Sequence, residues 1–170
     1  KGLDYTSDTV KQMVDQGQWV DPTIGHHLLG SEAKARGEPG PMDPHWAVSF
    51  KVVAEEEHID TLNKMHDAGV RFTTGLDMGM PSGTHDRSAA NAWALVETLG
   101  WANWKAINAS TAGTAEALGL VKQIGSLQAG MFADIAAFAG DPAKNIRDMD
   151  QASTVVQLGR LLKLNGTVLV

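Results

Sequence analysis

The residue pattern changes near position 120, and this change constrains the fold more than any other feature of the sequence. Before it, two short strand-like segments are separated by longer stretches with the periodicity of amphipathic helices. The predicted strands are 19–24 and 70–77, and the predicted helices are one that begins at Thr6 or Ser7 and others at 44–68, 89–99, 104–108 and 112–118. After the change, strand-like segments follow one another closely, at 133–138, 154–158, 160–164 and 167–170. The sequence therefore predicts an α/β part followed by a small antiparallel β part.

Local signals support this division. Residues 70–77 combine β-branched and aromatic side chains and lead into a glycine-rich turn, as a short buried strand does. Asn165 and Gly166 both tolerate positive φ, which predicts a two-residue hairpin turn between antiparallel strands. Residues 30–44 contain several glycines and prolines and are predicted to form a long loop.

The length and the charge of the chain exclude several classes of protein. The chain has 170 residues, which suits one compact unit but falls below the roughly 200 residues of a complete eight-stranded βα barrel. Its net charge of −6, without adjacent Lys or Arg residues, argues against nucleic acid or an anionic membrane surface as a partner. No apolar run approaches the roughly 18 residues of a membrane span. The absence of Cys excludes disulfides, thiolate metal sites and a Cys nucleophile.

The start of the sequence carries two further expectations. No signal-peptide pattern opens it, which favours a cytoplasmic location. The first residue is Lys1 rather than Met, which predicts that a preceding segment has been removed.

A series of motifs runs through the second half of the chain. The predicted strand at 70–77 ends in Gly-Leu-Asp, with Asp77 as its last residue, and His85 precedes an amphipathic helix. Residues 105–111 follow with the sequence Lys-Ala-Ile-Asn-Ala-Ser-Thr. Next come Gly-Ser-Leu at 125–127, Gly130, Ala-Asp at 133–134, an apolar strand and Gly-Asp-Pro at 140–142. Taken together, this ordered series resembles the last part of the amidohydrolase superfamily, nearest to its imidazolonepropionase-like and Xaa-Pro dipeptidase-like members.

The resemblance implies a particular architecture. Residues 1–120 would form the last strands and helices of a TIM barrel, with 19–24 as its seventh strand and 70–77 as its eighth. Residues 121–170 would form the C-terminal share of a small composite β-sandwich built from both ends of the parent chain. The other barrel strands, and the His-x-His motif that the family carries on its first strand, have no counterpart in this sequence.

The resemblance also assigns candidate site residues. Asp77 matches the aspartate that ends the final barrel strand in the family, where it binds a metal or lies beside it and accepts a proton from the attacking water. The alternative is an aspartate that caps the following turn. His85 resembles a position near the substrate, and its alternative is an ordinary polar residue at the start of a helix.

The remaining histidines are weaker candidates. His26 and His27 follow the predicted strand 19–24 and could reach the mouth of the barrel, which makes His26 a candidate substrate contact. Adjacent residues on an extended chain point to opposite sides, so both rings cannot face one ion. The alternative is a pair of solvated loop side chains. His58 and His66 lie on one predicted helix, roughly 12 Å apart along its axis, which is too far to share a metal.

The number of available ligands limits the functional prediction. A catalytic zinc takes about three protein ligands and a water, and Asp77 is the single ligand that the resemblance assigns. We therefore predict a fragment of a metal-dependent amidohydrolase that cleaves C–N bonds in amide, cyclic amide or dipeptide-like substrates and is inactive alone. The complete enzyme is predicted to use a divalent metal, zinc in the first instance, whereas this chain alone is predicted to bind none.

A non-catalytic assembly module is the alternative function. A partial barrel leaves strand edges unpaired and apolar helix faces uncovered, a liability that proteins normally hide. The predicted partners are therefore a second copy in a homo-oligomer or the missing N-terminal half of the parent. The parent is also predicted to bind a small amide or peptide-like substrate.

Overall fold

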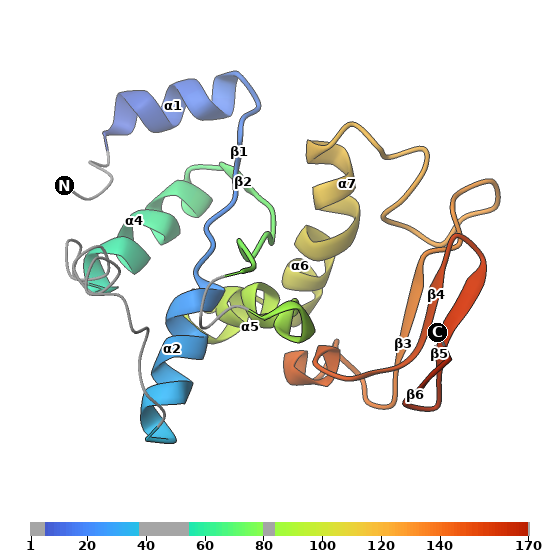
Figure 1. Ribbon diagram of the computed structural model, residues 1–170. Coiled ribbons are helices and arrows are strands. Elements are labelled where there is room, and N and C mark those ends of the chain that lie inside the picture. Colours follow the sequence, from blue (N-terminus) through green and yellow to red (C-terminus); the bar gives the residue numbers. More distant parts are fainter. Residues whose placement is uncertain (1–5, 38–54, 80–83, 170) are drawn as a thin grey trace.

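The computed structural model describes residues 6–37, 55–79 and 84–169 (Figure 1). Its helices are α1 (Ser7–Asp15), α2 (Gly25–Ala35), α4 (Glu55–Asp67), α5 (Ala90–Glu97), α6 (Asn103–Asn108) and α7 (Thr114–Ala117), with the 3₁₀ turns η1 (His85–Arg87) and η3 (Ile146–Met149) and the π-helix η2 (Ala109–Gly113). Its strands are β1 (Trp19–Val20), β2 (Arg71–Phe72), β3 (Ile135–Phe138), β4 (Ala152–Gln157), β5 (Arg160–Leu164) and β6 (Thr167–Val168).

The molecule has two parts of different character. In the first, α1, α2, α4 and α5 surround the parallel pair β1–β2, and in the second, β3 to β6 form an antiparallel sheet (Figure 1). The run from α6 to α7 lies between the two parts (Figure 1). The predicted α/β part followed by an antiparallel β part is therefore confirmed. No helix in the described ranges is both long enough and apolar enough to cross a membrane.

Helix α1 has the boundaries that its sequence predicts. The Thr6 hydroxyl accepts a hydrogen bond from the Thr9 amide at 3.2 Å and so caps the first turn. At the other end, Gly17 adopts a φ of 64°, which a glycine reaches without steric cost. Val10 points inward and is 2% exposed, so this amphipathic helix packs one apolar face on the core.

Both parallel strands are shorter than the sequence predicts. Trp19 pairs with Arg71 and Val20 with Phe72, and a last ladder bond runs from the Thr73 amide to the Val20 carbonyl at 2.9 Å. Pro22 then follows in the first segment, and proline has no amide hydrogen to donate to a ladder. Beyond this point side chains rather than backbone groups join the two segments.

Helix α2 differs from the sequence prediction. Residues 30–35 were expected in a loop and His26 on an extended chain, but both belong to this helix. Glycine punctuation suggested the loop, yet Gly30 lies inside the helix with open space around its Cα. The helix is held from outside, because the buried Asn91 side chain accepts a hydrogen bond from the Gly25 amide at 2.9 Å. Residues 38–44 of the predicted loop and 44–54 of the predicted helix 44–68 lie outside the described ranges.

The hydrophobic core lies among the helices of the first part. Its largest fully buried side chains include Trp93 and Leu95 of α5, Leu62 of α4 and Val10 of α1. The apolar periodicity of the predicted helix 89–99 therefore marked a truly buried face, with Trp93 at 0% exposure.

The two short helices predicted around residues 104–108 and 112–118 form one continuous helical run. A π-helical turn joins α6 to α7, and hydroxyl groups bond to carbonyls of preceding residues within it. Ser110 and Thr111 donate to the carbonyls of Ala106 and Ile107, each at 2.8 Å. These side-chain bonds add to the backbone bonding of the run, since the Ala106 carbonyl also accepts from the Ala109 amide.

The antiparallel sheet has the strand order β3-β4-β5-β6. The Asn165–Gly166 turn is confirmed, with φ of 48° and 82°, as a hairpin turn with two positive φ values requires. A second turn of the same kind joins β4 to β5 at Leu158 and Gly159, with φ of 49° and 78°. β3 and β6 are the two outer strands of this sheet.

Arg147 of η3 connects the segment before β4 to the helical part. Its guanidinium donates two hydrogen bonds to Glu97, both at 2.5 Å, and lies 2.6 Å from a carboxylate oxygen of Glu32. Its central carbon lies 4.5 Å from the ring centroid of Trp93. The hydrogen bonds to Glu97, followed by those to Glu32, raise the pKa of Arg147 above its usual value. This cluster holds η3 against α5 and α2.

Candidate functional site

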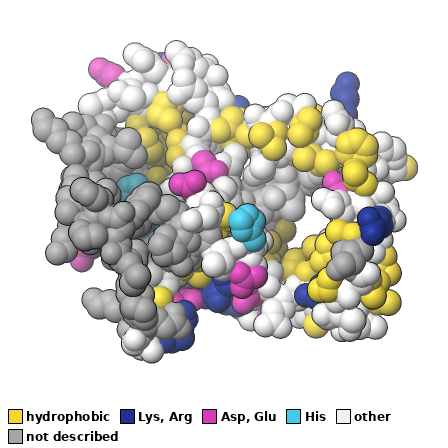
Figure 2. Space-filling model, in the orientation of Figure 1, with side chains coloured by type: hydrophobic (Ala, Val, Ile, Leu, Met, Phe, Trp, Pro, Cys, Tyr) yellow, Lys and Arg dark blue, Asp and Glu magenta, His cyan; other side chains and the backbone are white. Residues whose placement is uncertain are grey.

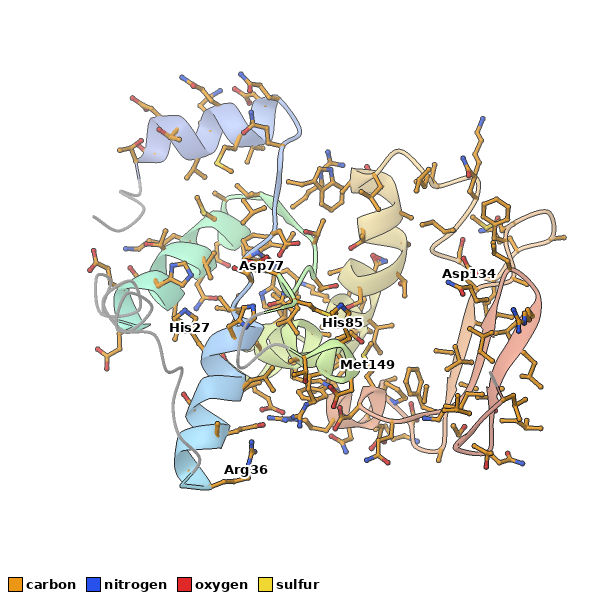
Figure 3. The ribbon with its side chains drawn as sticks, viewed as in Figure 1. His27, Arg36, Asp77, His85, Asp134 and Met149 are labelled. Atoms are coloured by element: carbon orange, nitrogen blue, oxygen red, sulfur yellow. The ribbon has the colours of Figure 1, made fainter. Side chains whose placement is uncertain are left out.

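The carboxyl ends of β1 and β2 define the candidate site. The two strands run parallel, so the residues that follow each of them emerge at the same edge. Asp21 directly follows β1 in the sequence. Asp77 lies beyond the end of β2 (Figure 3). In α/β proteins this edge is where ligands and catalytic groups gather.

Asp77 combines an exposed side chain with an unusual backbone conformation. Its φ of 53° lies in the left-handed region, which few residues other than glycine occupy. Nε2 of His26 lies 3.1 Å from the Asp77 carbonyl oxygen. His26 itself is 6% exposed, so its ring is part of the protein interior. The structure thus brings two of the predicted site residues together, through a backbone contact.

Asp21 joins the two strand ends and was not singled out in the sequence. Its carboxylate accepts hydrogen bonds from the Gly75 amide at 2.7 Å, from the Thr73 hydroxyl at 3.1 Å and from the Thr23 amide at 3.3 Å. A Cβ atom at Gly75 would lie 2.0 Å from this carboxylate, so the contact depends on glycine. The only signal in the sequence is an aspartate directly after one predicted strand and a glycine near the end of the other.

His85 lies on the η1 turn, with an exposed side chain (Figure 3). His27, the neighbour of His26, faces another element, because its ring centroid is 6.1 Å from that of His58 on α4. Burial of the His58 ring, with a smaller effect of His27, lowers the pKa of His58. His66, at the other end of α4, packs on Trp101 with 4.3 Å between ring centroids.

The donor atoms of this edge do not form a complete metal site by themselves. Within residues 6–37, 55–79 and 84–169, no three His, Asp or Glu side chains are grouped closely enough to hold an ion. Asp77 is an exposed carboxylate that can serve as one ligand, and the ring of His26 is directed at a carbonyl oxygen. A metal at this edge therefore requires ligands from beyond these ranges.

Apart from this edge, the structure has an apolar hollow between the helical run α6–α7 and the antiparallel sheet. It has a volume of about 620 Å³, and mainly apolar side chains line it, among them Ile107, Phe132, Ile135 and Phe138. Figure 2 shows hydrophobic side chains gathered on the sheet side of this opening. The hollow borders β3, whose outer edge has no strand partner within the described part of the chain.

Comparison with known proteins identifies the family. The model of the amidohydrolase family matches residues 3–166, so the chain belongs to the amidohydrolase family. No curated protein matches the sequence significantly.

Several solved structures of longer proteins contain the fold of this chain. A Xaa-Pro dipeptidase with methionine bound in its active site is 24% identical, with a TM-score of 0.77 over 95% of this chain and 38% of its own. A prolidase in complex with N-methylphosphonate-L-proline is 23% identical, with a TM-score of 0.74 over 94% of this chain and 38% of its own. The ochratoxinase of A. niger is 21% identical, with a TM-score of 0.69 over 95% of this chain and 35% of its own. The chain thus spans less than two fifths of the length of these relatives.

Proposed function

We propose that this chain forms the C-terminal part of a metal-dependent amidohydrolase that hydrolyses C–N bonds in amide, cyclic amide or dipeptide-like substrates. One observation carries the proposal: in a chain of the amidohydrolase family, Asp77 presents an exposed carboxylate in the segment that follows the carboxyl end of the parallel strand β2. Two of the similar structures are described as a Xaa-Pro dipeptidase and a prolidase, which favours dipeptide-like substrates.

Asp77 acts as the catalytic base in this proposal. Its carboxylate accepts a proton from the attacking water and delivers that proton to the leaving amine. His85, exposed on the turn before α5, contacts the substrate, and His26 supports the site from within. Asp77 would hold a divalent metal, with zinc as the first candidate, together with ligands from outside this chain, and the metal would lower the pKa of the water toward neutrality.

The proposed architecture places β1 and β2 as the last two strands of a barrel and β3 to β6 as one share of a composite sandwich. The parallel pairing of β1 with β2 supports the first assignment. The apolar hollow beside the outer edge of β3 supports the second, because a strand added there would cover it. In this proposal the boundary between the barrel part and the sandwich part lies near residue 120.

Exposed apolar side chains favour association with further protein. Four large apolar side chains are each more than half exposed, namely Leu127, Phe132, Leu158 and Val168. Large apolar areas that stay exposed mark sites of protein association. The partner in this proposal is the missing N-terminal half of the enzyme. A homo-oligomer is the other outcome, and sedimentation of the purified chain distinguishes it from a monomer.

Metal analysis combined with turnover tests the proposal. The purified 170-residue chain is incubated with Zn²⁺, desalted, and assayed with a series of Xaa-Pro dipeptides. We expect neither stoichiometric zinc nor hydrolysis by this chain. The polypeptide in which the preceding coding sequence is restored should hydrolyse the dipeptides and lose this activity on Asp77→Asn.

The two parts of the proposal can fail separately. Stoichiometric zinc and turnover by the chain alone, both lost on Asp77→Asn, would contradict the need for outside ligands. An extended polypeptide that folds but shows no turnover with zinc, manganese or cobalt would contradict the assignment as an enzyme.

A further inference from the structure

We propose that His26 is a positioning residue for Asp77, acting through the backbone carbonyl rather than through the substrate. This inference rests on the proposed function of Asp77 as the catalytic base. His26 and Asp77 are 51 positions apart in the sequence, and His26 Nε2 lies 3.1 Å from the Asp77 carbonyl oxygen. A carbonyl oxygen only accepts hydrogen bonds, so Nε2 carries the proton and donates it.

The hydrogen bond from His26 acts on the backbone of Asp77, which sets the direction of its side chain. The Asp77 side chain is exposed, so the direction of its carboxylate depends on the backbone from which it projects. That backbone has a φ of 53°, in the left-handed region, which aspartate enters more readily than most residues with a Cβ atom but less readily than the right-handed region. A hydrogen bond to the carbonyl of the same residue restrains the peptide plane that follows this φ. Without it, we expect the residue to return to negative φ and the carboxylate to change direction.

His26 is itself held rigidly. The residue before it, Gly25, donates its amide hydrogen to the buried Asn91 side chain at 2.9 Å. A Cβ atom at Gly25 would lie 2.8 Å from the backbone nitrogen of Asn91 and 2.6 Å from Leu76 Cδ1, so α2 begins in tight contact with α5 and with the segment that follows β2. The His26 ring is 6% exposed. Its donor therefore has little freedom to follow Asp77 if that residue moves.

Three successive residues after β2 are fixed in this way by the segment after β1. The Gly75 amide binds the Asp21 carboxylate, Leu76 packs on Gly25, and the Asp77 carbonyl accepts from His26. Each contact involves backbone or a buried apolar group, and none uses the Asp77 carboxylate. These contacts hold the backbone around Asp77 and leave its carboxylate available for chemistry.

The positioning role predicts a kinetic pattern different from substrate binding. His26 is buried and directed at a carbonyl oxygen, so its removal should lower kcat and leave KM nearly unchanged. A substrate contact, which the sequence suggested, would instead raise KM. A displaced catalytic group commonly costs roughly 10- to 100-fold in rate.

NMR on the 170-residue chain tests the structural step without any activity. At a pH where histidine is neutral, the ring nitrogen shifts of His26 should show a protonated Nε2, and the Cα shift and amide coupling of Asp77 should show positive φ. The left-handed signature should be lost in His26→Leu and kept in His26→Gln, whose amide group retains a donor. An unprotonated Nε2 in the wild type, or positive φ retained in His26→Leu, would overturn the proposal. The wild-type and His26→Gln measurements decide the question if His26→Leu does not fold.

Kinetics of the extended polypeptide test the functional step. We expect His26→Leu to lower kcat roughly 10- to 100-fold with KM within about twofold, and His26→Gln to recover most of the loss. His27→Gln is the matched control, because His27 is adjacent on α2 and its ring faces His58. Raised KM with unchanged kcat would assign His26 to substrate binding and reject the positioning role.

Asp77→Asn, assayed in parallel, distinguishes failure of the proposed role of Asp77 from failure of the positioning role of His26. Full activity of Asp77→Asn would refute the proposed function itself. An inactive Asp77→Asn together with a fully active His26→Leu would refute the positioning role and leave the proposed function intact.

Discussion

The contact between Gly75 and Asp21 allows a sharp test of how the two strand ends are joined. Gly75→Ala adds one methyl group, and its Cβ would lie 2.0 Å from Asp21 Oδ2, whereas real Cβ contacts stay beyond 3.0 Å. The carboxylate must therefore move by about 1 Å or more. This movement breaks the hydrogen bonds from the Gly75 amide at 2.7 Å and from the Thr73 hydroxyl at 3.1 Å.

The size of the effect follows from these terms. The atom in the way is the end of an exposed carboxylate that can rotate aside, so the added methyl group costs little by itself. Hydrogen bonds to charged groups contribute about 1.5–3 kcal/mol each when buried, but Asp21 is exposed and water replaces part of what is lost. We therefore expect Gly75→Ala to lower the free energy of unfolding by about 1–2 kcal/mol. For a chain of this size, that lowers the melting temperature by roughly 2–8 °C.

Urea unfolding followed by circular dichroism measures the effect, and two further variants make the result specific. Gly30→Ala is the matched control, because it adds the same methyl group in α2 with nothing within 4 Å. That change should stabilise by about 0.5–1 kcal/mol, since alanine favours a helix over glycine. In the Asp21→Ala background the carboxylate is gone, and Gly75→Ala should then cost close to nothing.

Additivity would refute this reasoning. If Gly75→Ala costs the same with and without the Asp21 carboxylate, to within about 0.5 kcal/mol, the loss does not come from their contact. A cost below about 0.5 kcal/mol in the otherwise unchanged chain would likewise show that the carboxylate is not held there.

Three other predictions concern different parts of the chain. Arg147→Met should lower the free energy of unfolding by about 1–2 kcal/mol in urea titrations, because it removes the paired hydrogen bonds to Glu97; no change would show that solvent screens the pair. Because the pKa of His58 is lowered in the folded chain, the unfolded chain binds more protons than the folded chain as the pH falls below about 6.5. Stability should therefore fall as the pH drops below that value and level off below the folded pKa, and His58→Gln should flatten the dependence; an equal slope in both proteins would contradict it. Gly166→Ala should lower the free energy of unfolding by about 1 kcal/mol, measured as a lower melting temperature. Gly166→Asn should lower it by less, because asparagine tolerates the φ of 82° at this turn better than alanine. Equal losses in the two variants would argue against a backbone cause.

Much of the fold could be predicted because its signals are local. The Asn165–Gly166 turn, the capped start of α1 and the buried face of α5 each depend on a few neighbouring residues. The same local signals misled where a tertiary contact prevailed. Gly30 and the residues after it suggested a loop, yet α2 continues to residue 35.

The candidate site shows where prediction from sequence reached its limit. Asp77 was found through the motif that it shares with the amidohydrolase family, and the family itself is confirmed. The roles of Asp77, His26 and His85 stay predictions. Asp21 was missed, because an aspartate before a proline has many uses and its partner Gly75 lies 54 positions away.

By itself, the sequence determined the order of helices and strands, the hairpin turns and the family, because these depend on local backbone preferences and on side-chain patterns. The tertiary structure alone decided which residues meet at the ends of β1 and β2. The parallel pairing brings distant segments to a common edge, and only there do Asp21 and His26 find the backbone groups of Gly75 and Asp77. Hydrogen bonds of this kind depend on positions in space that no local pattern encodes.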